Sequence, residues 1–253
     1  MANNKVALIT GGSRGLGRNA AVRLAEKGID VIVTYVSKET EAGEVVNELK
    51  ATGVNAATLR LNVADISSFE SFSTELTSIL KEQFHVDRFD YLVNNAGTGA
   101  TIPFMNVTEG DFDSLMNVHF KGVFFLTQKL VALMNDGGSV INLSSGTTRM
   151  CNPGYIVYAS MKGGVEVMTR YMAKELGPRK IRVNIVAPGA VETDFNNAII
   201  RNNPEIKNRI ASNTALGRVG EPDDIGGVIA FLCSKDAGWI NGQRIEVSGG
   251  IWL

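Results

Sequence analysis

The chain has 253 residues, a formal net charge of −1 at pH 7 and a sequence pI of about 6.2. Hydrophobic residues make up 44% and charged residues 20%, a balance typical of a folded globular protein and not of a disordered chain. No net positive charge would draw nucleic acid or an anionic membrane, and no apolar run approaches the roughly 18 residues that cross a bilayer. We therefore expect one cytoplasmic domain, residues 1–253, without nucleic-acid or membrane partners.

The sequence offers no ligand set for a metal. Cys151 and Cys233 lie far apart without a CxxC motif, and the chain holds 2 histidines. We expect reduced thiols and no metal site.

Short segments rich in Val and Ile alternate with longer segments of helical period. The first helical segment carries Leu16, Ala20 and Leu24 on one face and ends at Gly28. The alternation predicts an α/β fold, a single Rossmann-type doubly wound domain with helices on both faces of a parallel sheet. Seven strands are predicted, at residues 6–10, 31–35, 56–61, 91–93, 139–143, 182–186 and 244–247.

Helix start signals stand at Asp65, before the helical segment 66–84, and at Glu221, before Pro222. Between the sixth strand and that last helix, residues 192–220 interrupt the alternation. Because doubly wound proteins build ligand sites from insertions at the carboxyl ends of strands, we predict a substrate lid there. Its apolar residues predict one or two short amphipathic helices, which either cover an apolar substrate or pack the lid onto the body: Phe195, Ile199, Ile200, Ile206 and Ile210.

A glycine-rich turn, residues 10–17, joins the first strand to the first helix. Glycine permits positive φ and lets a pyrophosphate approach the backbone at the helix N-terminus. Many strand-helix turns carry glycine, so it is the position after the first strand that predicts a nucleotide site. The residues assigned to it are Gly11, Ser13, Arg14, Gly15, Leu16 and Gly17.

Tyr158 and Lys162 stand four positions apart in the helical segment 155–176, so both project from one face. A free tyrosine has a pKa near 10, and a nearby ammonium group lowers it, which makes proton transfer practicable. Taken alone, this pair is more often a helix surface on which a lysine stem packs against a tyrosine.

The glycine spacing matches the TGxxxGxG pattern of the short-chain dehydrogenases/reductases. Further matches follow in chain order over nearly the whole length: Asn94-Asn95-Ala96-Gly97, Asn117, Ser145, Tyr158 with Lys162, and Pro188-Gly189 with Thr193. The chain thus resembles that family, in which hydride passes between a nicotinamide and a ketone or secondary alcohol.

The resemblance implies a role for each matching residue. Tyr158 would exchange a proton with the substrate oxygen, and Lys162 would hold the nicotinamide ribose and tune the tyrosine. Ser145 would hydrogen-bond the substrate oxygen. Asn117 would hold a water in a proton relay through the lysine. His119 would be a packing or interface residue.

The expected cofactor is NADP, with NAD the weaker alternative. NAD-preferring relatives place an acid at the end of the second strand, where this chain reads Thr34-Tyr35, while Arg14 and Lys38 supply positive charge. Asn94 is expected mainly to tie strands together. The remaining cofactor residues implied by the resemblance are Tyr35, Ser37, Lys38, Asn62, Val63, Asn94, Ala96, Gly97, Pro188, Gly189, Val191 and Thr193.

The substrate stays open between a small ketone or alcohol and a 3-oxoacyl group on an acyl-carrier protein. The chain is similar to 3-oxoacyl-(acyl-carrier-protein) reductases at residues 186–189 but has no basic stretch at residues 134–138, although Arg179 and Lys180 remain as docking residues. A nucleotide-binding sensor or scaffold without turnover is the non-enzyme alternative. Homotetramers are common among relatives, so a homotetramer is expected here.

Overall fold

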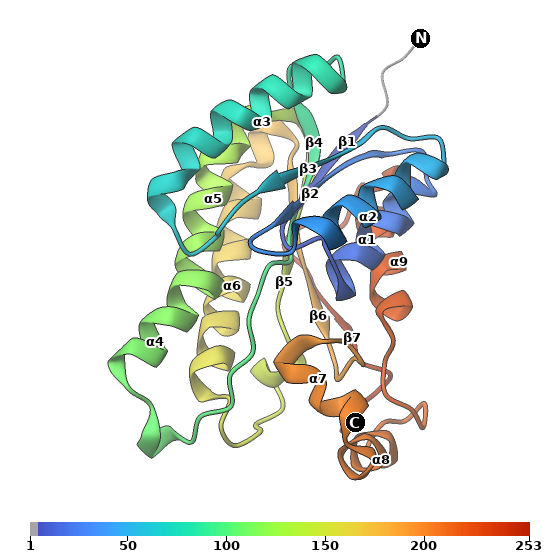
Figure 1. Cartoon of the computed structure of the whole chain (residues 1–253). Helices are drawn as coiled ribbons and strands as arrows, with labels where there is room; N and C mark the ends of the chain where they lie inside the picture. The colour runs from blue at the N-terminus through green and yellow to red at the C-terminus, as the bar shows by residue number, and fades with distance from the viewer. Residues whose placement is uncertain (1–4) are drawn as a thin grey trace.

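The strands are apolar on both faces, because helices cover the sheet from two sides. In the computed structural model, which describes residues 5–253, the seven predicted strands form one parallel sheet with its core on either side (Figure 1). They are β1 (Val6–Ile9), β2 (Asp30–Tyr35), β3 (Ala56–Arg60), β4 (Phe89–Asn94), β5 (Met134–Leu143), β6 (Arg182–Pro188) and β7 (Arg244–Val247).

The strand order is β3-β2-β1-β4-β5-β6-β7, so the chain reverses direction across the sheet between β1 and β4. Ligands of doubly wound proteins bind outside the carboxyl ends of the strands at such a reversal. The predicted doubly wound α/β fold is confirmed.

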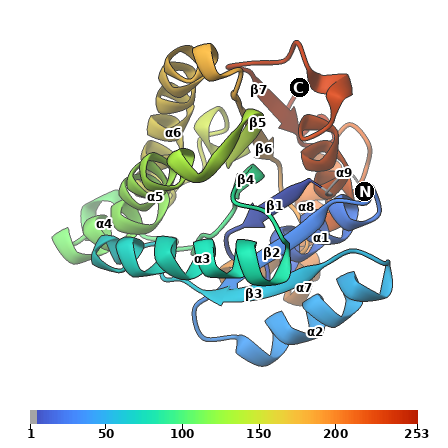
Figure 2. The same cartoon turned by 90° about the horizontal axis from the view of Figure 1, so that it is seen from above.

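Two helical layers enclose the sheet, and each buries its own apolar cluster (Figure 2). One layer consists of α1 (Gly15–Ala25), α2 (Glu39–Ala51) and α9 (Pro222–Leu232). The other consists of α3 (Phe69–Gln83), α5 (Gly122–Leu130) and α6 (Ile156–Glu175), with α4 (Glu109–Met116) packed beside α6.

The predicted helix boundaries are found where their signals stand. Gly28, with φ of +72°, follows α1, and the Asp65 side chain accepts from the backbone N–H of Ser67 in a short 3₁₀ turn ahead of α3. Glu221 and Asp224 form a capping box at the start of α9.

Residues 192–220 form two short helices at the carboxyl edge of the sheet, α7 (Phe195–Asn202) and α8 (Pro204–Ser212), beside the C-terminus (Figure 1). The backbone of α7 is irregular, since Asn196, Asn197 and Ala198 have φ of +52°, +58° and +54°. The C-terminal segment contacts the C-terminal end of α8, because the N–H of Trp252 donates to the carbonyl oxygen of Asn213 at 2.9 Å.

Candidate active site

The turn between β1 and α1 is shaped by direct backbone packing. Gly11 has φ of +66°, and a Cβ there would lie 2.9 Å from Cα of Ala96. A Cβ on Gly17 would lie 2.5 Å from Nδ2 of Asn95, which donates to the carbonyl oxygens of Thr10 and Gly11 at 2.9 and 3.0 Å. Glycine is required because the segment after β4 packs directly on the turn, and Asn95, which carries that contact, was not among the assigned residues.

The N-terminus of α1 fits an anionic group. Among residues 5–253 no side chain caps it, and its first turn holds no acid, so its N–H groups can donate to a ligand. Thr193 lies 3.8 Å from where a Gly15 Cβ would stand, and Nη1 of Arg14 is 3.9 Å from Oδ2 of Asp194. These donors and this close approach fit the pyrophosphate of a nicotinamide dinucleotide.

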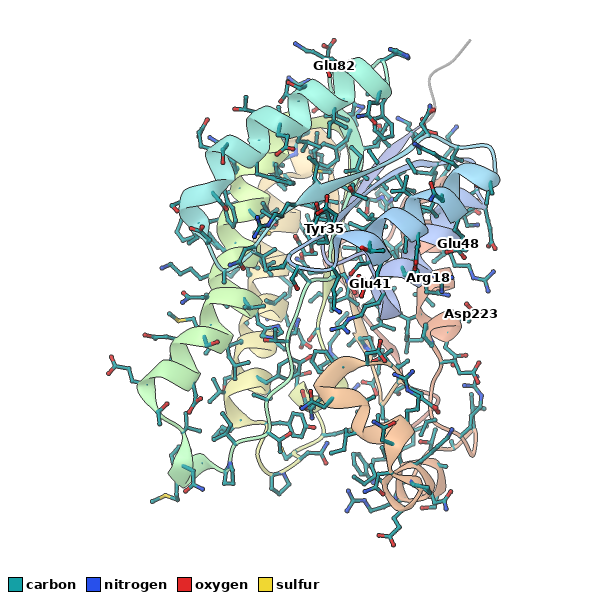
Figure 3. All side chains as sticks on the ribbon, viewed as in Figure 1. Arg18, Tyr35, Glu41, Glu48, Glu82 and Asp223 are labelled. Atoms are coloured by element: carbon teal, nitrogen blue, oxygen red, sulfur yellow. The ribbon has the colours of Figure 1, made fainter. Side chains whose placement is uncertain are left out.

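The end of β2 carries charges of both signs. Lys38 pairs with Glu41 at 3.0 Å, and burial together with a hydrogen bond to Glu39 raises the pKa of Tyr35. Figure 3 labels Tyr35 and Glu41 on these neighbouring segments. Arg60 pairs with Tyr35 in the sheet and adds a further cation. The two acids in the first turn of α2 were not anticipated, although helix N-termini favour them.

Ser145, Tyr158 and Lys162 come together where β5 and α6 meet. Tyr158 and Lys162 lie on one face of α6, as predicted, with the Lys162 Nζ 5.7 Å from the centre of the Tyr158 ring. A side-chain hydrogen bond joins Ser145 to Tyr158. Lys162 is 4% exposed and donates to the carbonyl oxygen of Leu143 at 2.7 Å. An ammonium has three donors, so two remain for other partners.

The pKa of Tyr158 shifts in the direction opposite to the predicted one. Burial raises the pKa of Tyr158 to about 12, and the hydrogen bond with Ser145 only partly opposes it. Burial also lowers the pKa of Lys162 to about 8. Desolvation is the largest effect on both pKa values, because burial removes water from the charged form of each group. The Lys162 ammonium donates to a backbone carbonyl and not to the phenol.

His119, which was not assigned to the site, contacts this cluster. A single π turn, Asn117–Lys121, separates α4 from α5, and it directs the His119 ring against Tyr158 at 4.9 Å between centroids. The expected role of Asn117, holding a water in a proton relay, stays a prediction. The burial of His119 against Tyr158 agrees with its expected packing role.

Two assigned cofactor residues direct their side chains into the core. Asn94 donates to Oγ1 of Thr127 at 2.9 Å and to Oδ1 of Asn142 at 2.8 Å, which confirms the expected strand tie. Val63 is 7% exposed within the apolar cluster, so it offers only backbone to a ligand. The other assigned residues lie after the carboxyl ends of the strands: Ser13 and Leu16 after β1, Ser37 after β2, Asn62 after β3, Gly97 after β4, and Pro188, Gly189 and Val191 at and after the end of β6.

Comparison with known proteins identifies the family of this chain. A short-chain dehydrogenase/reductase family model described as enoyl-(acyl carrier protein) reductase matches residues 11–251. The chain belongs to the short-chain dehydrogenase/reductase family of oxidoreductases. It is 38% identical to the hydroxynaphthalene reductase-like protein Arp2 of Metarhizium brunneum, covering 97% of this chain and 94% of that protein. It is also 38% identical to the 3-oxoacyl-(acyl-carrier-protein) reductase FabG of Staphylococcus aureus, over 100% of both chains.

Solved short-chain dehydrogenase/reductase structures agree closely with this fold. The promiscuous reductase LugOII, which catalyses keto-reduction at C1 during lugdunomycin biosynthesis, superposes with a TM-score of 0.94 at 38% identity, covering 99% of each chain. The angucycline C-6 ketoreductase LanV with bound NADP gives a TM-score of 0.93 at 37% identity, covering 98% of this chain and 96% of that one.

Aromatic rings flank Tyr158 on the side facing residues 192–220 of this short-chain dehydrogenase/reductase. The Tyr155 and Phe195 rings lie 6.4 and 6.0 Å from it, and Nδ2 of Asn196 donates to the Tyr155 hydroxyl at 3.1 Å. A depression of about 590 Å³ continues outward from them, lined by Gly99, Ala100, Thr101, Asn196, Asn197, Ile199, Asn202 and Asn203.

Within residues 5–253, no group of three or more His, Cys, Asp or Glu side chains could hold a metal ion. Over the same residues, every helix is too short or too polar to span a bilayer.

Proposed function

We propose that this protein reduces a ketone to a secondary alcohol with NADPH, and that Tyr158 supplies the proton. The observation that carries the proposal is the grouping of the half-buried Ser145 with the buried Tyr158 and Lys162 at the sheet edge that also holds the glycine turn.

In this mechanism the bound nicotinamide supplies the hydride. The hydroxyls of Ser145 and Tyr158 donate hydrogen bonds to the carbonyl oxygen, which orients it and stabilises the charge that develops there. The phenol proton then moves to that oxygen, the Lys162 ammonium 5.7 Å from the ring opposes the negative charge left on the tyrosine, and its two remaining N–H donors would hold ribose hydroxyls. Burial keeps the Tyr158 phenol protonated at neutral pH, the form that can donate a proton to the carbonyl oxygen.

NADPH is the proposed cofactor, because β2 ends at Tyr35 without a carboxylate and Arg14 and Lys38 stand nearby. LanV, a similar protein, binds NADP. Glu39 and Glu41 oppose this preference. We expect a higher kcat/KM for NADPH than for NADH, and the reverse order would contradict the assignment.

We propose a small aromatic or other flat cyclic ketone as the substrate. The rings of Tyr155 and Phe195 beside Tyr158 favour a planar apolar ligand, and residues 192–220 would serve as its lid. Arp2 and LanV are named for hydroxynaphthalene and angucycline reduction.

Reduction of a 3-oxoacyl group on an acyl-carrier protein is the second candidate, favoured by the full-length similarity to FabG. Arg179, a residue expected to dock the carrier, pairs with Asp136 at 2.8 Å and donates to the carbonyl oxygens of Val131 and Met134. It precedes β6, at the opposite end of the sheet from Ser145. Both facts favour the free ketone.

Initial rates of NADPH oxidation with 1-tetralone, 2-tetralone, a naphthoquinone and acetoacetyl thioesters of coenzyme A and acyl-carrier protein test these candidates. We expect the cyclic ketones to be preferred, and Tyr158→Phe to lower kcat by about 10²–10⁴-fold. NADPH affinity, followed by fluorescence, should not change in that variant. Faster turnover of the carrier thioester would select the second candidate, and NADPH binding without any turnover would select a sensor or scaffold.

We propose a homotetramer assembled through α4, α5 and α6. Support comes from the exposed apolar side chains Phe112, Phe124, Phe125, Val167 and Tyr171 on these helices. A sedimentation mass equal to one 27.2 kDa chain would contradict the assembly. The expected cytoplasmic location stays a prediction.

A further inference from the structure

His119 occupies an unusual backbone position beside the proton donor. It lies in the π turn Asn117–Lys121, and its side chain is 1% exposed. π turns are rare and occur often at functional sites, where the extra residue redirects a side chain. Here the redirected side chain is an imidazole in contact with Tyr158.

The imidazole of His119 contacts two segments, helix α6 and the loop that follows β4. On one side its ring meets the Tyr158 ring edge to face, at 4.9 Å and 85°. On the other side Nε2 lies 2.8 Å from the carbonyl oxygen of Thr98, and a Cβ on Gly97 would stand 2.8 Å from Cε1. His119 therefore spans the gap between α6 and the loop that follows β4.

The imidazole is neutral. Burial, reinforced by the positive charge of Lys162, lowers the His119 pKa to about 3. Nε2 lies 2.8 Å from the carbonyl oxygen of Thr98 and 3.3 Å from its backbone N–H; the shorter contact favours the tautomer with the proton on Nε2, in which Nδ1 carries a lone pair. That nitrogen is buried and has no hydrogen-bond partner among residues 5–253. His119 thus adds no second cation beside Lys162.

We propose that His119 is a positioning residue for the reaction: it holds the Tyr158 phenol at a fixed separation from the loop 96–98, which follows β4 and faces the cofactor crevice. This rests on the proposed function, in which Tyr158 is the proton donor. His119 does not itself transfer the proton. It acts through the orientation of the phenol, because a displacement of about 1 Å in a reacting group can cost 10²-fold in rate.

Three substitutions separate the contacts that the imidazole makes. His119→Phe keeps a ring against Tyr158 but loses the hydrogen bond to Thr98, His119→Gln keeps a donor for Thr98 but loses the ring, and His119→Ala loses both. By the same 10²-fold scale, we expect kcat to fall about 100-fold in the Ala variant and about 10-fold in the other two. NADPH affinity should change less than about twofold, because Nε2 and the ring face protein groups.

The solvent deuterium isotope effect on kcat is the readout that a purely structural role would not move. Partial misfolding lowers the amount of active enzyme but leaves the isotope effect of the active fraction unchanged. A misplaced phenol makes proton transfer slower and more rate-limiting, so the isotope effect should increase in His119→Phe and His119→Ala. An unchanged isotope effect with a lower kcat would overturn the proposal.

Lys121→Gln is the matched comparator, because Lys121 is an exposed residue of the same turn, and it should retain the isotope effect of the unsubstituted protein. An isotope effect that changes as much in Lys121→Gln as in His119→Ala would overturn the proposal. Crystal structures of the NADPH complexes of the unsubstituted protein and His119→Ala decide the matter independently of turnover. We expect the Tyr158 ring to shift in the variant; an unmoved ring would overturn the positioning role, whereas absence of ketone turnover in the unsubstituted protein would overturn only the proposed function.

Discussion

The glycine turn and the proton-transfer cluster lie at the same sheet edge, but they are built in different ways. The turn is made by backbone: Gly11 and Gly17 leave no room for a Cβ, and its charged neighbour Arg14 remains in solvent. The cluster is made by buried side chains, with Tyr158 and Lys162 9% and 4% exposed. Backbone packing should therefore determine cofactor binding at the turn. Burial and charge should determine the properties of the proton-transfer cluster.

The largest effect is expected from Gly17→Ala. Alanine normally stabilises a helix by up to about 1 kcal/mol relative to glycine, yet a Cβ here would collide with Asn95 and with the carbonyl oxygen of Gly11. Because the turn must then open, we expect NADPH affinity to fall at least about 100-fold, the scale on which a 1 Å misplacement acts. Fluorescence titration of NADPH measures the loss.

Gly43→Ala is the matched control, since Gly43 also lies in a helix and a Cβ there would meet nothing within 4 Å. It should bind NADPH normally and be slightly more stable. Equal affinity in Gly17→Ala and Gly43→Ala would show that backbone packing does not govern the turn.

The same contrast explains what the sequence could predict. All seven strands, the glycine turn and the common face of Tyr158 and Lys162 follow from local spacing, which one segment contains by itself. The contact of His119 with Tyr158 was not predicted, because it depends on a π turn that shifts the direction of its side chains, and no spacing rule reveals that turn. The predicted lowering of the Tyr158 pKa was wrong, because the burial that raises this pKa comes from segments distant in the chain.

The buried cluster also predicts an acid sensitivity. His119 has a folded pKa of about 3 against an ordinary value of 6.5, so between these pH values the unfolded chain binds the extra proton. The free energy of unfolding then falls as pH falls, by about 1.4 kcal/mol for each pH unit below 6.5. Lys162 remains charged and Tyr158 protonated throughout this window, so neither contributes to the slope.

Urea unfolding at pH 7.5 and 5.5 measures this sensitivity. On moving to the lower pH, the unsubstituted protein should lose about 1.4 kcal/mol more than His119→Phe, which has no group to titrate. Identical losses would mean that His119 is not held neutral in the fold.

A smaller effect is expected from the polar network beneath Ser145. Oε1 of Glu166 accepts from Ser144 at 2.6 Å, from Thr148 at 2.9 Å and from Nε of Arg244 at 2.8 Å. Nη2 of Arg244 donates in turn to the carbonyl oxygen of Ser145 at 3.4 Å. Glu166→Gln weakens the charged pair that fixes this backbone, so kcat should fall roughly fivefold, the equivalent of about 1 kcal/mol.

The exposed Glu175→Gln on the same helix is the control for Glu166→Gln and should leave kcat unchanged. A change in KM for NADPH instead of kcat would place the network on the cofactor side of the site.

The smallest effect is expected where the glycine turn meets solvent. The side chains of Arg14 and Lys38 are 58% and 50% exposed and pair with Asp194 and Glu41, so their attraction for a 2′-phosphate is screened and partly neutralised. Arg14→Gln combined with Lys38→Gln should weaken NADPH binding by about three- to fivefold, corresponding to about 1 kcal/mol or less. NADH affinity should stay constant, and the difference between the cofactors should shrink as salt is added. An equal loss for NADH would mean that the two cations contact the pyrophosphate that both cofactors share, and the preference for NADPH would then have to come from Arg60 beside Tyr35.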